Sequence, residues 1–154
     1  PEAMDAAMTD MVSLQWRTGN AARVAFLVAD APTQLEGREP FLERANEARL
    51  AGIKVYPVAA SGVSPDAEFQ MRNAAQATLG RYLFLTDDSG VGGTHAEPHI
   101  PCYQVQHLNK LINRMIASEL TGERIPVESG DVLRSVGDPN DGVCTLKDGS
   151  KAFL

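Results

Sequence analysis

The stretch Arg23-Val24-Ala25-Phe26-Leu27-Val28-Ala29-Asp30-Ala31-Pro32 decides the fold that we expect for this chain. Its aliphatic, β-branched and aromatic residues predict a strand, and the near-continuous apolar run is typical of a strand covered on both faces of a parallel sheet. Asp30 lies at the carboxyl end of this strand, where the chain turns. Ligands of open α/β sheets bind outside the carboxyl ends of the strands, so Asp30 is a candidate site residue.

Helical and extended patterns alternate on both sides of this strand. Apolar spacing predicts helices over residues 1–16, 41–50 and 65–79, and from Val105 to near Gly122. Further strands are expected over residues 53–59 and 81–85, with Pro57 at a position where no ladder donor is needed. This alternation favours parallel pairing through right-handed crossovers, hence an α/β fold with a mostly parallel sheet.

Length, composition and charge narrow the function classes. The chain has 154 residues, of which 44% are hydrophobic and 22% charged, as expected for a globular domain. The net charge of −6 argues against nucleic acid or an anionic membrane as the main partner, because both attract clustered Lys and Arg. The longest apolar runs are too short for membrane insertion, which takes about 20 residues. Since the chain begins with Pro1 in a helical pattern, we expect it to start inside a longer gene product.

The two cysteines, Cys102 and Cys144, leave two interpretations open. They are either free, partly buried thiols or a disulfide that ties the tail to the segment before the last helix. A disulfide would indicate an oxidising compartment. The tail itself, residues 123–154, lacks periodicity, although Asp148-Gly149 favours a short hairpin between residues 145–146 and 152–153.

The loop over residues 86–101 contains two patterns that resemble ligand sites. Gly90-Val91-Gly92-Gly93 lacks the basic residue and the immediate helix start of a phosphate-binding loop. The segment also contains His and Cys side chains, which zinc accepts as ligands. Prolines interrupt the segment, however, so we favour the interpretation that its histidines lie on the surface. The zinc candidates are His95, His99, Cys102 and His107.

Four segments together resemble the second half of a bacterial von Willebrand factor A (vWA) domain. Residues 1–7 resemble the helix after that fold's second metal-site loop, and residues 24–32 resemble the strand with its third metal motif. Residues 52–58 resemble the next strand, and residues 74–82 the passage from helix to strand that follows. The resemblance implies a Rossmann-like three-layer sandwich, with residues 1–122 as the carboxyl-terminal part of a vWA domain and residues 123–154 as an irregular tail.

The resemblance also implies a function, which is non-enzymatic binding of a protein ligand, as in cell adhesion. In an intact module, Mg²⁺ or another divalent cation would accept a carboxylate from the ligand. Asp30 matches the acid of the third motif, while Ala29 and Ala31-Pro32 replace its usual neighbours. The first motif, Asp-x-Ser-x-Ser, does not occur, and the second would precede Pro1. We therefore expect an incomplete metal site, with weak or no cation binding by this chain alone.

Two further expectations follow from this interpretation. A sheet that lacks its central strand exposes an edge, which favours self-association. A disulfide would favour a bacterial cell-envelope location, periplasmic or extracellular. The alternative function is a small α/β hydrolase or nucleotide-binding protein that uses the strand-end region of Asp30 and Ser61, although the Gly-x-Ser-x-Gly hydrolase motif is absent.

Overall fold

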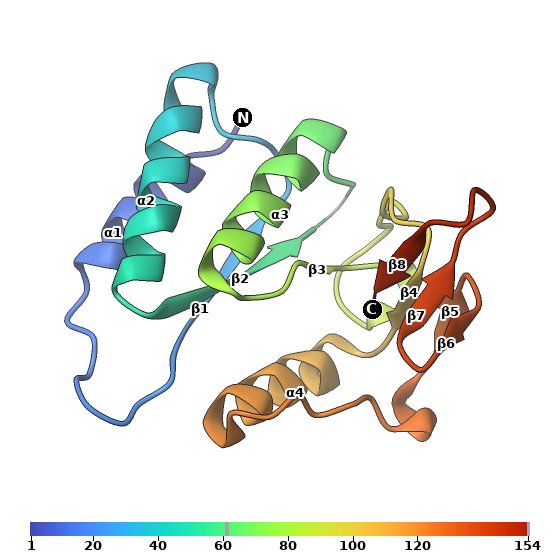
Figure 1. The fold of residues 1–154 in the computed structure, drawn as a ribbon. Helices are drawn as coiled ribbons and strands as arrows, with labels where there is room; N and C mark the ends of the chain where they lie inside the picture. Colours follow the sequence, from blue (N-terminus) through green and yellow to red (C-terminus); the bar gives the residue numbers. More distant parts are fainter. Residues whose placement is uncertain (61, 154) are drawn as a thin grey trace. The chain divides into compact units, whose positions relative to one another are not determined.

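A computed structural model describes residues 1–60 and 62–153, and the chain divides into two compact units (Figure 1). The first unit is Pro1–Leu85 and the second is Thr86–Leu154. The fold is mixed α/β, as predicted, with three helices in the first unit and one in the second among the described residues. The expected vWA-like boundary at residue 122 stays a prediction.

The first unit alternates helices and strands. In chain order its elements are α1 (Met4–Ser13), β1 (Arg23–Ala29), the 3₁₀ turn η1 (Leu35–Gly37), α2 (Arg38–Leu50), β2 (Ile53–Ala59), α3 (Pro65–Thr78) and β3 (Leu83–Phe84). The strands form a parallel sheet in the order β1-β2-β3. The predicted parallel pairing is therefore confirmed for these three strands.

All seven residues of β1 pair with β2, from Arg23 opposite Ile53 to Ala29 opposite Ala59. On the other side of β2, the Ala59 carbonyl accepts from the Leu85 N–H, and the Val55 N–H donates to the hydroxyl of Thr78. Because backbone groups alternate in direction along a strand, the odd-numbered residues of β2 face away from β1. Pro57 therefore removes no bond from the β1–β2 ladder, in agreement with the sequence-based expectation.

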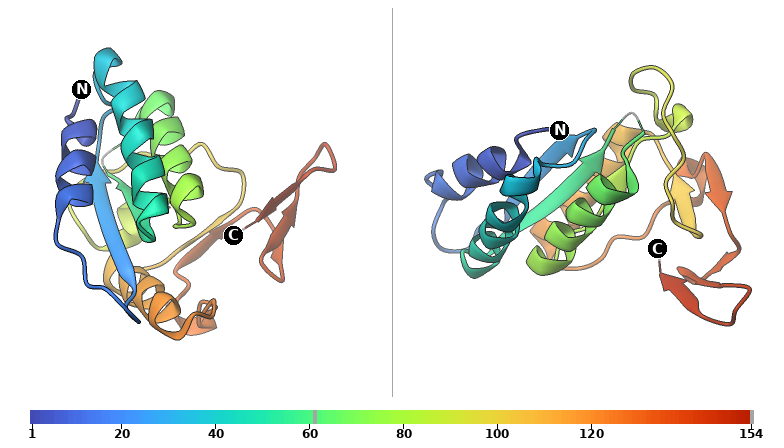
Figure 2. Two further views of the ribbon diagram at one scale, coloured as in Figure 1. Left: turned by 60° about the vertical axis from the view of Figure 1, so that its left-hand side comes forward. Right: turned by 90° about the horizontal axis from the view of Figure 1, so that it is seen from above.

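Helices α1, α2 and α3 lie side by side along one face of the sheet (Figure 2). Helix α2 contacts both α1 and α3, while α1 contacts β1 and α3 contacts β2. Between helices and strands lies a buried apolar cluster. Its members are Met4, Met8, Ala29, Phe41, Ala45, Ala48, Ile53, Val55, Ala59, Met71 and Ala74.

The expectation that β1 is buried on both faces is wrong. Val28 is 62% exposed, and most of the strand is only half-buried, whereas β2 is almost entirely buried. The physical reason is that β1 is an edge strand, paired on one side only among the described residues. An apolar run indicates a strand, but it does not reveal how many neighbours that strand has.

Helix α3 begins and ends as its sequence predicts. The side chain of Ser64 caps the first turn by accepting from the Ala67 N–H, and Pro65 follows at the start of the helix. At the other end Leu79 is left-handed, and Gly80 then passes close to β2. A Cβ on Gly80 would lie 1.9 Å from the Val55 carbonyl oxygen, so this crossing requires glycine.

The second unit contains short elements. They are the 3₁₀ turn η2 (Asp87–Ser89), β4 (Tyr103–Val105), α4 (Leu108–Thr121), the turn η3 (Ser129–Asp131), β5 (Arg134–Val136), β6 (Pro139–Asn140), β7 (Val143–Thr145) and β8 (Lys151–Phe153). Strands β4 and β5 pair antiparallel, and β6, β7 and β8 form a separate antiparallel sheet. The predicted hairpin at Asp148-Gly149 is confirmed by the pairing of β7 with β8.

Two expectations for this unit require correction. Val105 lies in strand β4 rather than in the last helix, because its side chain is buried in the β4–β5 pair before the helix begins at Leu108. The tail is not irregular, since it supplies β5 to β8. Strands of two or three residues are too short for sequence periodicity to reveal them.

Cys102 and Cys144 form a disulfide with an S–S distance of 2.02 Å, which confirms one of the two interpretations left open. Both residues are buried, and the bond ties the segment before β4 to the middle of β7. Within the described residues, no helix has the length and apolar character needed to cross a membrane.

Candidate functional site

Asp30 lies at the carboxyl edge of the parallel sheet, directly after β1, with its side chain exposed. Its carboxylate contacts Glu2, which lies before α1 in the chain and at the same edge of the sheet. The Glu2 N–H donates to the Pro32 carbonyl, and Glu2 pairs with Thr33 in a single parallel bridge. Burial raises the pKa of Glu2 above its usual value, and the hydrogen bond to Asp30 raises it further.

A buried polar pair continues this edge toward α3. The amide oxygen of Gln70 accepts from both the backbone N–H and the hydroxyl of Thr33, at 3.2 and 3.0 Å. Both residues are buried, and the Gln70 Nε2 has no hydrogen-bond partner among the described residues. The pair fixes the turn after β1 against α3, so the backbone that carries Asp30 is held in place.

The described residues of the carboxyl edge do not form a complete site for a divalent cation. Among the described residues, this edge brings together two carboxyl groups, those of Asp30 and Glu2. Mg²⁺ requires about six oxygen ligands in octahedral geometry. In residues 1–60 and 62–153, no three His, Cys, Asp or Glu side chains are grouped so that they could hold a metal ion. The role of Asp30 as a metal ligand stays a prediction, and it requires further ligands besides Asp30 and Glu2.

Ser61, the second residue of the alternative hydrolase hypothesis, lies outside the described residues. The part of that hypothesis that concerns a nucleophile near Asp30 therefore stays a prediction.

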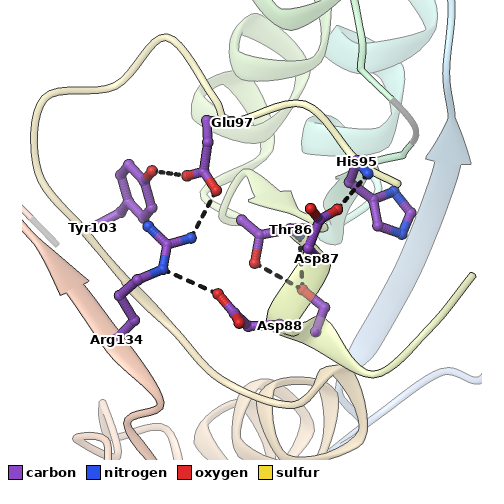
Figure 3. Close-up of polar contacts among 8 residues, drawn as sticks. Thr86, Asp87, Asp88, His95, Glu97, Tyr103 and Arg134 are labelled. Carbon is purple, nitrogen blue, oxygen red and sulfur yellow. Dashed lines mark hydrogen bonds and ion pairs between the residues drawn. The ribbon is translucent and has the colours of Figure 1, made fainter. Parts of the chain in front are cut away.

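A second polar cluster lies in the second unit, where the loop after Thr86 meets strands β4 and β5 (Figure 3). Arg134 of β5 donates from Nη2 to Glu97 at 2.7 Å and from Nε to Asp88 at 3.0 Å. Its guanidinium carbon also lies 5.9 Å from the ring centroid of Tyr103, a cation–π distance. The hydrogen bonds to Glu97 and then Asp88 raise the pKa of Arg134, so the guanidinium remains charged.

Tyr103 completes this cluster by donating its hydroxyl hydrogen to Glu97. Burial raises the pKa of the Tyr103 phenol, and the acceptor Glu97 raises it further. Every charged group of the cluster is paired, and the side chains of Arg134, Asp88 and Glu97 are 36%, 48% and 52% exposed. We interpret the cluster as a clasp that holds the loop on the β4–β5 pair.

His95 has a structural position in the same loop. Its backbone N–H donates to Asp87 at 2.6 Å, and its Nε2 lies 2.6 Å from the Val91 carbonyl oxygen. Gly92 packs against the imidazole, because a Cβ there would lie 3.3 Å from Nε2. The expectation that the loop histidines lie on the surface is therefore wrong for His95, although His99 is exposed.

Some of these residues could be predicted from the sequence, and others could not. Asp30 was recognisable because it follows an apolar strand. Glu2 was not, because its contact with Asp30 spans an entire helix and a loop. Arg134 lies 46 residues from Asp88, and only the pairing of β4 with β5 brings them together.

Comparisons with protein-family models, with curated proteins and with solved structures found no match for this chain.

Proposed function

We propose that the chain is the carboxyl-terminal part of a vWA-type module with a Rossmann-like three-layer sandwich, and that it binds a protein ligand without catalysing a reaction. The observation that carries the proposal is the parallel β1-α2-β2-α3-β3 unit with an exposed acid at the carboxyl end of β1. This is the position at which α/β sheets of this kind bind their ligands.

The surroundings of Asp30 support recognition of a protein surface. The turn η1, which follows β1, presents Leu35, which is 76% exposed, and the N-terminal half of α3 presents Phe69, which is 66% exposed. An ion pair between Arg38 and Asp66 joins the first turns of α2 and α3. Exposed apolar side chains beside polar ones are typical of protein-binding surfaces.

We propose that the binding does not depend on a metal held by this chain alone, because no group of three metal-ligating side chains occurs among the described residues. In a titration calorimeter we expect Mg²⁺ to give weak or no heat with the isolated chain. Tight stoichiometric binding that is lost in Asp30→Ala would show that the described residues hold a complete cation site.

We place the protein in an extracytoplasmic setting, the bacterial periplasm or cell exterior. The supporting observation is the Cys102–Cys144 disulfide, because such bonds persist in oxidising compartments and are rare in reducing ones.

Site-specific photo-cross-linking tests the proposed function. A photoreactive amino acid replaces Leu35, near the carboxyl edge, or Leu50, an equally exposed residue at the far end of α2. We expect one protein adduct from position 35 in the cells that encode the chain, no adduct from position 50, and loss of the adduct when Asp30 is changed to Ala.

A substrate screen tests the non-enzymatic part of the proposal. Esterase, phosphatase and nucleotidase substrates should give background rates with the full chain. Turnover abolished by Asp30→Asn or Ser61→Ala, with the fold intact, would instead establish the hydrolase alternative.

A further inference from the structure

The two edges of the first unit's sheet, at the carboxyl and the amino ends of its strands, differ in charge. At the amino edge, where the strands begin and α1, α2 and α3 end, three segments contain basic residues and no acidic ones (Figure 1). The segments are residues 14–23, 49–54 and 79–82, and their basic residues are Arg17, Arg23, Arg49, Lys54 and Arg81. The carboxyl edge instead carries acids such as Glu2, Asp30 and Glu36. The amino edge is therefore a basic surface on an acidic chain.

Hydrogen bonds to uncharged oxygens hold part of this basic surface in place. Arg23 donates from Nε to the Arg17 carbonyl at 2.8 Å and from Nη1 to the Ala51 carbonyl at 2.9 Å, which joins two of the three segments. Arg49, in the last turn of α2, donates to the side-chain oxygen of Asn46 at 3.0 Å. Because these acceptors carry no net charge, the contacts position the two guanidinium groups without neutralising them.

Each of the three helices also ends in an exposed leucine at this edge. Leu14, directly after α1, is 61% exposed, Leu50, the last residue of α2, is 71% exposed, and Leu79, directly after α3, is 75% exposed. Basic residues are favoured at helix C-termini, so part of the charge has a structural explanation. The exposed leucines have no such explanation. Apolar side chains beside Lys and Arg are typical of surfaces that adsorb to anionic lipid.

Leu79 occupies a backbone conformation that is costly for leucine. Its φ of 60° lies in the left-handed region, which favours glycine and asparagine. The other left-handed residues after helices are glycines, with Gly52 following α2 and Gly122 following α4. Because the Leu79 side chain is largely exposed, packing does not explain why leucine stands there. Strained residues of this kind are concentrated at functional sites.

The acids of the carboxyl edge do not oppose the binding of an anionic surface at the amino edge. A strand of seven residues, such as β1, is about 20 Å long, whereas the Debye length at physiological ionic strength is about 8 Å. The negative charges at one edge are therefore screened at the other. The net charge of −6 belongs to the whole chain and does not describe this surface.

We propose that the amino edge of the first unit binds the surface of an anionic phospholipid membrane, without crossing it. Leu14, Leu50 and Leu79 enter the boundary between headgroups and acyl chains, and the basic residues contact the lipid phosphates. Because the leucines come from three separate helix ends, a deformable lipid surface can accommodate all of them at once. The inference goes beyond the proposed function, since the protein ligand is expected at the opposite edge, where Asp30 would face away from the lipid.

Co-sedimentation of the full chain with lipid vesicles tests the proposal. One kind of vesicle contains phosphatidylglycerol and phosphatidylcholine in equal parts, and the other contains phosphatidylcholine alone. Binding to the mixed vesicles should be at least about tenfold tighter, because each basic residue near an anionic surface strengthens binding about fivefold. The difference should largely disappear in about 1 M salt, where the Debye length falls to about 3 Å.

Leu79→Asn separates membrane binding from stability. Asparagine tolerates the left-handed conformation, so the free energy of unfolding should be unchanged or higher. Loss of an inserted apolar side chain should nevertheless weaken binding to the mixed vesicles by at least about fivefold. The control is Leu120→Asn, which changes a leucine of α4 that is 72% exposed and should leave vesicle binding within about twofold of the original.

A second pair of variants removes the same charge from two places on α2. Arg49 lies in the last turn, at the amino edge, whereas Arg44 lies nearer the middle and pairs with Glu47 at 2.8 Å. Arg49→Gln should weaken binding to the mixed vesicles by at least about threefold, and Arg44→Gln by less than about twofold.

Three outcomes would overturn the proposal. Equal binding to both kinds of vesicle would show that lipid charge is not recognised, and no binding to either would exclude a membrane as the occupant. A loss with Arg49→Gln but not with Leu79→Asn would show that the leucines do not enter the lipid, and would identify an acidic protein as the better occupant. Cross-linking from Leu35 is a separate measurement, so the proposed protein ligand stands or fails independently of these results.

Discussion

At the scale of single residues, two tyrosines show that the contribution of a hydroxyl group to stability depends on whether it has a hydrogen-bond partner. The Tyr103 hydroxyl donates to Glu97, whereas the Tyr82 hydroxyl is buried without a hydrogen-bond partner among the described residues. Burial is also the largest cause that raises the pKa of Tyr82, followed by the charge of Glu68. The same chemical change at the two positions should therefore have opposite effects.

We expect Tyr103→Phe to lower the free energy of unfolding by about 1 kcal/mol, because it removes a hydrogen bond to a carboxylate and keeps the ring beside Arg134. Tyr82→Phe should be neutral or stabilising, since it removes a buried polar atom that has no partner. Urea unfolding of both variants measures the difference. A larger loss for Tyr82→Phe than for Tyr103→Phe would contradict the assigned contacts.

The Glu2–Asp30 contact predicts a pH dependence. Because the folded pKa of Glu2 is raised, the folded state binds its proton more tightly than the unfolded state does. The resulting stabilisation is complete below the unfolded pKa and is lost as the pH rises through the folded pKa. Glu2→Gln, which is always neutral, should lack this loss.

The comparison is made from urea midpoints between pH 3 and pH 7, and Glu36→Gln on the exposed turn η1 is the control. The control should follow the original chain across the whole range. If the free energy of unfolding of Glu2→Gln falls with rising pH as steeply as that of the control, then the contact of Glu2 with Asp30 does not cause the pH dependence.

At the scale of elements, the crossing of Gly80 over β2 imposes a tight packing requirement on the first unit. Gly80→Ala would place a Cβ 1.9 Å from the Val55 carbonyl oxygen, which is backbone and cannot rotate away. We expect a loss of at least about 2 kcal/mol in unfolding free energy, at the upper end of overpacking costs. Gly93→Ala, with no atom within 4 Å of its Cβ, is the control and should change stability little.

The elements also show what a sequence can and cannot reveal. Strands of seven residues and helices of fourteen were predictable because their apolar periodicity is long enough to detect, as β2 and α3 demonstrate. The partial exposure of β1 was not, because burial depends on neighbouring strands, and among the described residues β1 has one on a single side only. The last residue of β4, Val105, has the spacing of the following helix and was predicted as its start, but it pairs with Arg134.

The candidate site follows the same physical rule. Asp30 follows directly after β1, a strand that the local sequence predicts, whereas the contact of Glu2 with Asp30 depends on the packing of α1. The clasp of Arg134 depends on β-pairing between segments some thirty residues apart, and a sequence carries no local signal for such a pairing. The disulfide could be posed as one of two alternatives, but only the structure brings the two sulfur atoms together.

At the scale of the whole molecule, the two units rely on different sources of stability. The large apolar cluster lies entirely in the first unit. In the second unit, the buried apolar residues among those whose side chains the structure describes are few, namely Cys102, Tyr103, Val105, Met115 and Cys144. A unit with so small a core needs a covalent or polar supplement. The disulfide and the Arg134 clasp supply it, and the disulfide should be the larger contribution.

The disulfide closes a loop across a sequence separation of 42 residues, which corresponds to about 4 kcal/mol in the loop-entropy model. We expect the paired change Cys102→Ala and Cys144→Ala to speed amide exchange in β4, β5 and β7 and to leave β2 unchanged. Exchange followed by mass spectrometry on peptides from each strand measures this, with the unreduced original chain as reference. Equal acceleration in β2 would show that the two units unfold together, and unchanged exchange in β7 would show that the second unit is stable without its covalent link.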